Sequence, residues 1–201
     1  MHRENAGTDP EHRVAPKTGK LFVLSGPSGA GKGTLRENAL KDIPELVYSV
    51  SCTTRQPREG EADGVQYRFI TREDFADRIA HDEFLEYAHV HDDMYGTLRA
   101  DVMRVLESGK NMLLEIDVQG ALQVKAKFPE AVLVFVDVPS IQELERRLRD
   151  RHTETESALQ TRLSNAVKER SLKDKYDYIV VNDTLESACA ELRRIILHDA
   201  G

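Results

Sequence analysis

Residues 21–34 read Leu21-Phe22-Val23-Leu24-Ser25-Gly26-Pro27-Ser28-Gly29-Ala30-Gly31-Lys32-Gly33-Thr34. The first half is an apolar run typical of a buried strand, and the second half is a glycine-rich turn that ends in a lysine. A helical pattern follows over residues 34–41. This order predicts a loop whose backbone N–H groups surround an anion, with a helix N-terminus behind it and a lysine beside it. We therefore expect a phosphate-binding loop.

The spacing of this loop matches G-x-x-x-x-G-K from Gly26 to Lys32 but departs from the usual pattern at the next position. That position normally carries a Ser or Thr hydroxyl that binds Mg²⁺, and here it is Gly33, so the metal must be held in another way. A structural turn with an incidental lysine is the alternative interpretation, because glycine-rich loops also serve as plain turns. The strand before the loop and the helical pattern after it favour phosphate binding.

The composition indicates one domain with small insertions and argues against several classes of protein. The chain has 201 residues, of which 40% are hydrophobic, which is enough for one full core. A net charge of -7 argues against a nucleic-acid binder or a protein that binds anionic membranes. No run approaches the ~20 apolar residues of a membrane span. Cys52 and Cys189 lie far apart and no secretory signal is visible, so we expect a reducing, cytoplasmic location.

Apolar periodicity divides the chain into a tail and a folded part. Residues 1–18 carry charges and prolines but little apolar pattern, so we expect a disordered tail. From residue 19 the chain alternates strands and helices, which predicts an α/β fold with a parallel sheet covered on both faces. The expected strands are 21–25, 47–51, 111–116, 131–138 and 178–181, and the expected helices are 34–41, 98–108, 121–127, 140–151, 157–172 and 185–197.

Residues 52–97 interrupt this alternation and are predicted to form a small α+β insertion. Its first part, residues 52–64, has several glycines and prolines and no period, so it is expected to be an exposed loop. A short strand is expected at 67–70, a helix after Thr71 with a capping arrangement that involves Asp74, and an extended segment at 84–90.

Acidic residues follow the second buried strand, at the edge of the sheet where the glycine-rich loop also lies. Because ligands bind at the carboxyl ends of parallel strands, Asp117 is expected near Lys32 and a bound phosphate. A carboxylate there could organise Mg²⁺ through water, and Glu115 on the same strand face could share that role. A solvated acid at the end of a strand is the alternative for both residues.

Two groups of arginines predict further phosphate contacts. Arg55 and Arg58 lie three apart in the glycine- and proline-bearing loop, and their planar forks suit bidentate contacts with a phosphorylated small molecule. Tyr67 and Tyr95 could add hydroxyl donors. A second group, Arg147, Arg151 and Arg162, surrounds a Thr-Glu-Thr-Glu segment like a flap that brings cations onto a migrating phosphoryl group. Solvated surface charge is the alternative for both groups.

Six segments together resemble the guanylate kinase family, in family order and from about residue 20 to the C-terminus. They are SGPSGAGK at 25–32, SCTTRQPREGE at 51–61, FLEY at 84–87, YGT at 95–97, EIDVQG at 115–120 and RHTETE at 151–156. The resemblance implies transfer of the ATP γ-phosphoryl group to GMP, with Mg²⁺ as cofactor. It also implies a P-loop NTPase-like sheet (core 19–51, 98–146 and 164–201), with residues 52–97 as the GMP-binding insertion and residues 147–163 as a helical lid.

The resemblance also assigns roles to individual residues. The implied GMP contacts are Arg55, Arg58, Tyr67 and Tyr95 on the phosphate and Ser51, Glu86, Thr97 and Asp117 on the base. The implied ATP contacts are Gly26, Pro27, Ser28, Gly29, Ala30, Gly31, Lys32, Gly33, Thr34 and, near the adenine, Asn182, and the implied catalytic cations are Lys32, Arg147, Arg151 and Arg162. No direct protein ligand to the metal is expected, so Mg²⁺ would be held by nucleotide phosphates and water, near Glu115 and Asp117.

The chemistry of Glu86 fits the role that the resemblance implies, because two carboxylate oxygens match the N1–H and exocyclic amine of guanine and adenine lacks that donor pair. Thr97 and Glu115 stand where some relatives have Ser and Asp. Two other functions stay open: a kinase for another monophosphate, and a non-catalytic module that uses the GMP site to bind phosphorylated peptides. Acceptance of dGMP and assembly into a homo-oligomer also stay open.

Overall fold

The computed structural model describes residues 18–90, 92–150 and 156–199. The expected disordered tail therefore lies almost wholly outside the described residues, as do Arg151 and the centre of the expected lid. Within the described part, no helix is long and apolar enough to cross a lipid bilayer.

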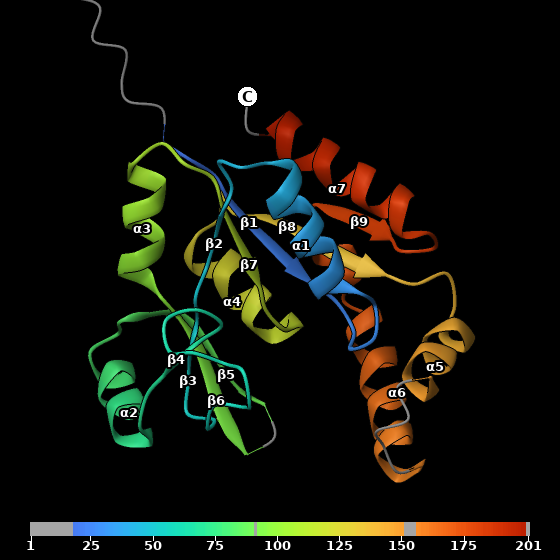
Figure 1. The fold of residues 1–201 in the computed structure, drawn as a ribbon, viewed down its shortest axis with the longest axis horizontal. Helices are drawn as coiled ribbons and strands as arrows, with labels where there is room; N and C mark the ends of the chain where they lie inside the picture. Colours follow the sequence, from blue (N-terminus) through green and yellow to red (C-terminus); the bar gives the residue numbers. More distant parts are fainter. Residues whose placement is uncertain (1–17, 91, 151–155, 200–201) are drawn as a thin grey trace, which may run out of the picture.

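A five-stranded parallel sheet forms the centre of the molecule, in the order β2-β7-β1-β8-β9 (Figure 1). Its strands are β1 (Leu21–Ser25), β2 (Val47–Tyr48), β7 (Met112–Glu115), β8 (Val132–Asp137) and β9 (Tyr178–Val181). All five residues of β1 are buried, because helices cover both faces of the sheet. Leu24 pairs with Glu115 and Ser25 with Phe135, so the loop after β1 and the end of β7 lie at the same edge.

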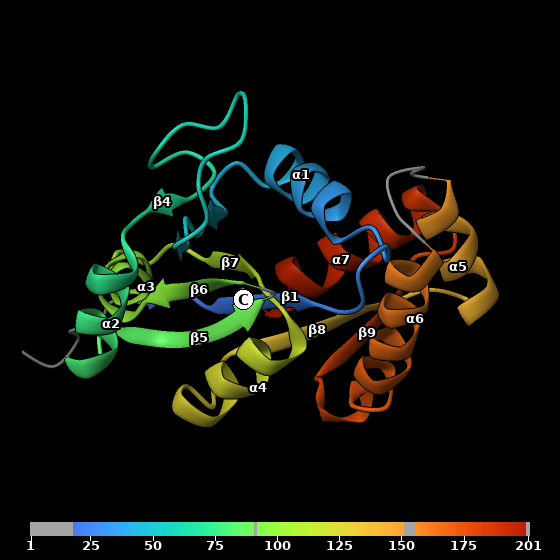
Figure 2. The same ribbon diagram turned by 90° about the horizontal axis from the view of Figure 1, so that it is seen from below.

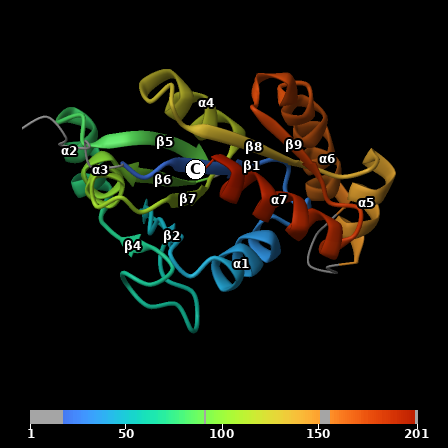
Figure 3. The ribbon, with the colours of Figure 1, turned by 90° about the horizontal axis from the view of Figure 1, so that it is seen from above.

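Helices divide the core into two layers, one on each face of this sheet (Figure 3). On one face lie α1 (Lys32–Asp42) and α7 (Leu185–Asp199), and on the other lie α3 (Arg99–Glu107) and α4 (Val118–Lys127). The helices α5 (Ile141–Arg149) and α6 (Glu156–Arg170) extend beyond the end of β8 and pack on the first of these layers through Leu144, Leu148, Leu159 and Leu163.

The insertion forms a second, four-stranded sheet in the order β4-β3-β6-β5. It consists of β3 (Cys52–Thr53), β4 (Arg68–Phe69), β5 (Phe84–Val90) and β6 (Asp93–Leu98), with α2 (Arg72–Ala80) packed on it through a small core of Cys52, Phe75 and Phe84. Figure 2 shows this sheet at one end of the molecule and α5 and α6 at the other, with the parallel sheet between them.

Three expected boundaries were wrong. Residues 52–64 are not all loop, because Cys52 and Thr53 pair with β4 and β6 as a central strand of the small sheet. The strand expected at 47–51 pairs with β7 only over Val47–Tyr48, since the chain then crosses to the second sheet. The helix expected at 121–127 begins at Val118, because Asp117 caps it by accepting the Gly120 N–H at 2.7 Å.

Candidate functional site

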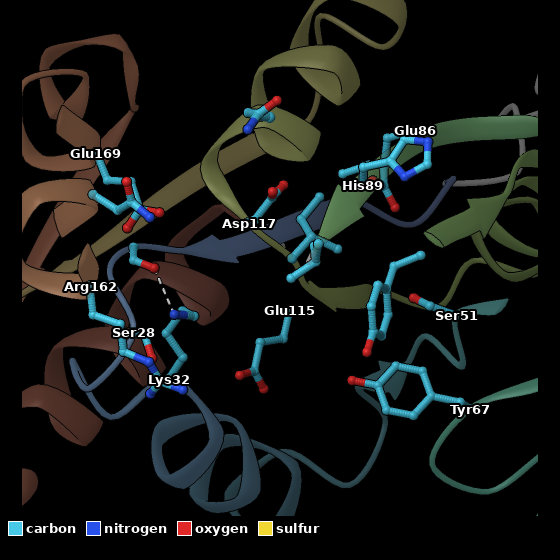
Figure 4. Close-up of a pocket in the computed structure, with 17 residues that line it drawn as sticks. Ser28, Lys32, Ser51, Tyr67, Glu86, His89, Glu115, Asp117, Arg162 and Glu169 are labelled. Atoms are coloured by element: carbon cyan, nitrogen blue, oxygen red, sulfur yellow. Dashed lines mark hydrogen bonds between the residues drawn. The ribbon is translucent and has the colours of Figure 1, made fainter. Parts of the chain in front are cut away.

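A cleft of about 600 Å³ opens at the carboxyl ends of the parallel strands (Figure 4). The loop after β1 forms its floor, the end of β7 and the start of α4 form one wall, and residues of β5, β6 and α6 close the two sides. The cleft therefore runs from the small sheet to α6. Segments more than a hundred residues apart in the chain meet there.

The floor is a loop in which Gly26 and Gly31 cannot be replaced without a clash. Gly29 and Gly31 have φ angles of 90° and 93°, in the left-handed region that favours glycine. A Cβ at Gly31 would lie 2.4 Å from Asn182 Nδ2, and a Cβ at Gly26 would lie 2.2 Å from the Val136 carbonyl oxygen. The loop is thus pressed against β8 and the segment after β9. Its conformation leaves the N-terminus of α1, which has no acidic residue in its first turn, open to an anion.

Lys32 lies across this loop. Its Nζ donates hydrogen bonds to the carbonyl oxygens of Gly26, at 2.6 Å, and Pro27, at 3.1 Å. Lys32 also lines the cleft (Figure 4). Glu169 on α6 faces the same region, and burial raises the pKa of its carboxyl while the charge of Lys32 opposes that shift.

A polar cluster around Glu86 forms the opposite end of the cleft. The Glu86 side chain on β5 accepts a hydrogen bond from Thr97 Oγ1 on β6 at 2.7 Å, and Ser51 Oγ lies 3.3 Å from the same hydroxyl. Asp117 and Gly120 at the start of α4 lie beside it, and a Cβ at Gly120 would be 2.6 Å from Glu86 Oε2. The glycine thus leaves room for this carboxylate. Four segments of the chain come together at one acidic group.

Burial dominates the electrostatics of Glu86. The residue is 3% exposed, and desolvation raises the pKa of its carboxyl to about 7, although the Thr97 hydrogen bond opposes the rise and Asp117 adds to it. The ionised form of such a buried carboxyl is stable only when hydrogen-bond donors contact its oxygens. A ligand that presents two adjacent N–H donors would meet this requirement.

Arg55 and its neighbours form a cationic corner beside the Glu86 cluster. Arg55 Nε donates to the Tyr95 hydroxyl at 3.3 Å, and its Nη2 forms an ion pair with Glu61 at 2.9 Å. The guanidinium lies 5.6 Å from the centre of the Tyr67 ring. Tyr67 and Tyr95 line the cleft, whereas the Arg58 side chain is exposed and does not. Glu61 therefore occupies one side of the Arg55 fork, where a phosphate could bind.

Glu115 lies in the middle of the cleft, between Lys32 and Tyr67 (Figure 4). Its Oε2 accepts a hydrogen bond from Arg36 Nη1 at 3.0 Å, and the same nitrogen donates to the Tyr48 hydroxyl at 3.2 Å. The other oxygen, Oε1, would lie 3.9 Å from a Cβ at position 33. Glu115 is thus an anchored carboxylate that faces the position of the missing loop hydroxyl, and not a freely solvated acid.

The arginines of the expected lid differ in position. Arg162 on α6 lines the cleft together with Asn165 and Glu169. Arg147 on α5 does not line it, because its Nε pairs with Glu143 at 2.7 Å and its Nη2 donates to the Asn182 carbonyl at 2.8 Å.

Asn182 follows the end of β9 and braces the phosphate loop. Its Nδ2 donates to the Ala30 carbonyl at 2.8 Å, and the residue is 6% exposed. This contact explains its place beside the loop. A contact between Asn182 and an adenine stays a prediction.

Comparisons with known proteins agree with this geometry. A sequence profile of guanylate kinases matches residues 18–199. The chain belongs to the guanylate kinase family. It is 49% identical over 179 residues to a guanylate kinase of Clostridium perfringens, which covers 89% of this chain and 83% of that relative. It is also 49% identical over 178 residues to a guanylate kinase of Fusobacterium nucleatum, at 89% and 96% coverage.

A solved structure confirms the fold expected from the resemblance to guanylate kinases. The crystal structure of guanylate kinase from Anaplasma phagocytophilum matches with a TM-score of 0.75 at 31% identity, over 92% of this chain and 87% of that chain. The α/β fold with a flanked parallel sheet and a small second sheet is therefore the guanylate kinase fold.

The structure brings ten of the residues expected from the guanylate kinase resemblance to the lining of one cleft. Those that line it are Gly26, Ser28, Lys32, Ser51, Tyr67, Glu86, Tyr95, Glu115, Asp117 and Arg162. Thr97 and Arg55 lie directly behind this lining, where they hold Glu86 and Tyr95. Sequence analysis missed the roles of Arg36, Glu61 and Glu169, because no local pattern distinguishes these charged residues from surface charge.

Proposed function

We propose that the protein transfers the γ-phosphoryl group of ATP directly to GMP, giving ADP and GDP. The observation that carries this proposal is a buried acid, Glu86, in the same cleft as a phosphate loop with Lys32. Membership of the guanylate kinase family supports it. A nucleotide held at each end would place a donor and an acceptor phosphate in the middle of the cleft.

Glu86 would select the guanine base. Its two oxygens would accept hydrogen bonds from N1–H and the exocyclic amine, and Ser51, Thr97 and Asp117 would complete the polar pocket around the base. Adenine offers no such donor pair, so AMP would leave the Glu86 carboxylate buried without donors. The proposed insertion, residues 52–97, would thus give the enzyme its specificity.

The acceptor phosphate would be held by Arg55, Arg58, Tyr67 and Tyr95. Arg55 already points its fork at an anion, the Glu61 carboxylate, and a phosphate would take the place of that group. The second pKa of a phosphate monoester is about 6, so the acceptor is largely a dianion at neutral pH. It therefore needs no side-chain base to attack the γ-phosphorus.

The donor phosphates would be held by the backbone of residues 26–34 and by Lys32, with Asn182 nearer the adenine. Arg147, Arg151 and Arg162 belong to the proposed lid, residues 147–163, between the core segments 98–146 and 164–201. Cations at these positions would stabilise the negative charge that spreads over the oxygens of the transferred group. Catalysis would then come from positioning and charge, without a covalent intermediate.

The residues near Gly33 fit the Mg²⁺ that accompanies ATP. Glu115 Oε1 faces the position where Gly33 lacks a hydroxyl, and a carboxylate is the kind of oxygen that accepts hydrogen bonds from magnesium-bound water. Glu115 and Asp117 would orient such waters without binding the metal directly. The ion itself supplies charge neutralisation to the phosphates.

The contacts proposed here address the base and the phosphate, so we extend the proposal to dGMP as an acceptor. Cys52 and Cys189 are free thiols, which supports the proposed cytoplasmic location. A homo-oligomer stays a prediction that sedimentation velocity would test.

ADP formation from MgATP with GMP, AMP, CMP and UMP side by side tests the proposed reaction. We expect product with GMP and little with the others. Product mainly with another monophosphate would refute the guanine assignment. Tight GMP binding without any product would instead favour a binding module.

A lysine variant tests the phosphate loop. Lys32→Met should abolish turnover and leave GMP binding largely intact, because Lys32 lies at the loop end of the cleft and Glu86 at the other. Lys41→Met, an exposed change at the end of the same helix, is the matched control and should keep wild-type turnover. Unchanged turnover in Lys32→Met would contradict the role of this lysine.

A further inference from the structure

A buried ion pair at the end of β8 has no part in the proposed reaction as described so far. The Asp137 carboxylate is 2% exposed, and Arg170 at the end of α6 binds it as a fork, with Nε at 2.7 Å and Nη2 at 3.1 Å. The same Nη2 donates to the Val138 carbonyl at 3.2 Å, and Lys173 Nζ lies 3.5 Å from the carboxylate. Such a fork holds its partners in a defined orientation.

The Asp137 side of this pair is tied to the phosphate loop. The Asp137 carboxylate accepts the Val138 N–H at 2.8 Å, and the backbone carbonyl of Asp137 accepts the Asn182 N–H at 2.8 Å. The Asn182 side chain in turn donates to Ala30 in the loop at 2.8 Å. The preceding residue, Val136, contacts Gly26 closely enough to exclude a Cβ there. Asp137 therefore belongs to the rigid frame of the loop.

The Arg170 side of the pair belongs to the helix that faces the donor phosphates. Arg162, Asn165 and Glu169 are spaced i, i+3 and i+7 on α6, so they share one face, and all three line the cleft. Arg170 follows Glu169 by one residue, about 100° around the helix. A contact at Arg170 therefore sets which way the cleft-facing stripe points.

The buried packing of α6 on the core is apolar, while its exposed first residue, Glu156, pairs with Arg149 of α5 at 2.8 Å. Leu159, Leu163 and Ala166 are buried in the layer that also contains α1 and α7. Apolar packing is non-directional, so by itself it permits small rotations and shifts of a helix. The ion pair supplies the direction that the apolar contacts lack.

We propose that Asp137 and Arg170 are positioning residues that fix the rotation of α6 against the phosphate loop, so that Arg162 meets the transferring phosphoryl group. This inference rests on the proposed function, because it assigns the pair to the phosphoryl-transfer step. Among the described residues, the polar partners of this pair are Val138, Lys173 and Asn182. None of them belongs to β5, β6 or α4, the elements that form the proposed GMP end of the cleft. The pair should therefore affect kcat and leave KM for GMP unchanged.

The test is a pair of variants, Asp137→Asn and the double variant D137N/R170M, assayed for ADP formation with GMP and for Tm. D137N keeps the volume of the side chain at position 137 but removes the carboxylate that pairs with Arg170, whose side chain is 20% exposed. Both Tm and kcat should therefore fall. A helix shift of about 1 Å can lower turnover about 100-fold, so we expect kcat to fall by about 10- to 100-fold. In the double variant no unpaired arginine remains, so Tm should recover while kcat stays low.

The separation of Tm from kcat distinguishes positioning from a structural role. Recovery of kcat together with Tm in the double variant, or an unchanged kcat in D137N, would overturn the inference. If D137N does not fold, the kcat of the double variant alone decides between a positioning role and a structural role. Arg194→Met, which removes an exposed ion pair with Glu191 on α7, is the control and should keep wild-type kcat. A wild-type protein without GMP-dependent ADP formation would refute the proposed function itself.

Discussion

The protonation of Glu86 gives a direct test of how the cleft selects its acceptor. Burial raises the pKa of this carboxyl to about 7 in the protein without ligand. The proposed contacts with guanine require the ionised form, because both groups on the base are donors. GMP binding should therefore remove the proton from Glu86 and weaken as the pH falls through this pKa.

The size of the effect follows from the titration of one group. With a pKa of about 7, Glu86 is about nine-tenths ionised near pH 8 and about one-tenth ionised near pH 6. The affinity for GMP should therefore fall about tenfold between these two conditions, which is about 1.4 kcal/mol. Near pH 7, binding should release about half a proton from this carboxyl.

Titration of GMP into wild type and Glu86→Gln, followed by NMR at several pH values, measures this dependence. The phosphate of GMP also titrates near ~6, and the Gln variant reports that contribution alone, because its side chain at position 86 does not ionise. Calorimetry of the wild type in buffers with different ionisation enthalpies counts the released protons. Equal pH dependence in both proteins would refute the assignment of Glu86 to the base.

The same pKa predicts how stability changes with pH when no nucleotide is present. The pKa of Glu86 rises from 4.5 to about 7 on folding, so the folded state binds this proton more tightly than the unfolded state. The free energy of unfolding should therefore fall as the pH rises from about 4.5 to about 7, by about 3 kcal/mol from this group. Urea denaturation near pH 5 and pH 8 should show that Glu86→Gln gains more stability over wild type at the higher pH than at the lower. An equal difference at both pH values would contradict this.

Two further substitutions test the phosphate sites. Glu61→Gln should lower KM for GMP, because it frees the Arg55 fork for the acceptor phosphate. Steady-state kinetics of Glu59→Gln, an exposed change in the same loop, provide the control. A KM for GMP that is unchanged from wild type in Glu61→Gln would contradict the proposal that the acceptor phosphate takes the place of the Glu61 carboxylate on Arg55. Gly31→Ala should destabilise the fold by at least about 1 kcal/mol and weaken ATP binding, since its φ of 93° disfavours a side chain and its Cβ would lie 2.4 Å from Asn182 Nδ2. Thermal unfolding measures the loss of stability, and titration with ATP measures the affinity. A wild-type ATP affinity in Gly31→Ala would contradict the second expectation.

Local patterns predicted the elements that depend on neighbouring residues. The apolar run at 21–25 is a fully buried strand, and Gly26, Gly29 and Gly31 after it do adopt positive φ angles. Thr71 caps α2 by accepting the Asp74 N–H at 3.0 Å, as its spacing predicted. Such features arise from backbone sterics and hydrogen bonds within a few residues, so they are written into the order of the chain.

Element boundaries were predicted less well where another part of the chain decides them. Cys52 and Thr53 were expected in a loop, yet they form a strand because β4 and β6 offer backbone partners on both sides. The strand expected at 47–51 is shortened because the chain must cross between the two sheets. Pairing partners that lie elsewhere in the sequence leave no local signal.

The sequence by itself determined the phosphate loop, the alternation of strands and helices, and most residues of the cleft, because these follow from spacing and from a family pattern. Only the tertiary structure decided which charges meet. Arg36 reaches Glu115 across 79 residues, and Arg170 reaches Asp137 across 33. The burial that raises the pKa of Glu86 likewise arises only when β5, β6 and α4 enclose it. These contacts depend on strand register and helix rotation, which are set by packing of the whole domain.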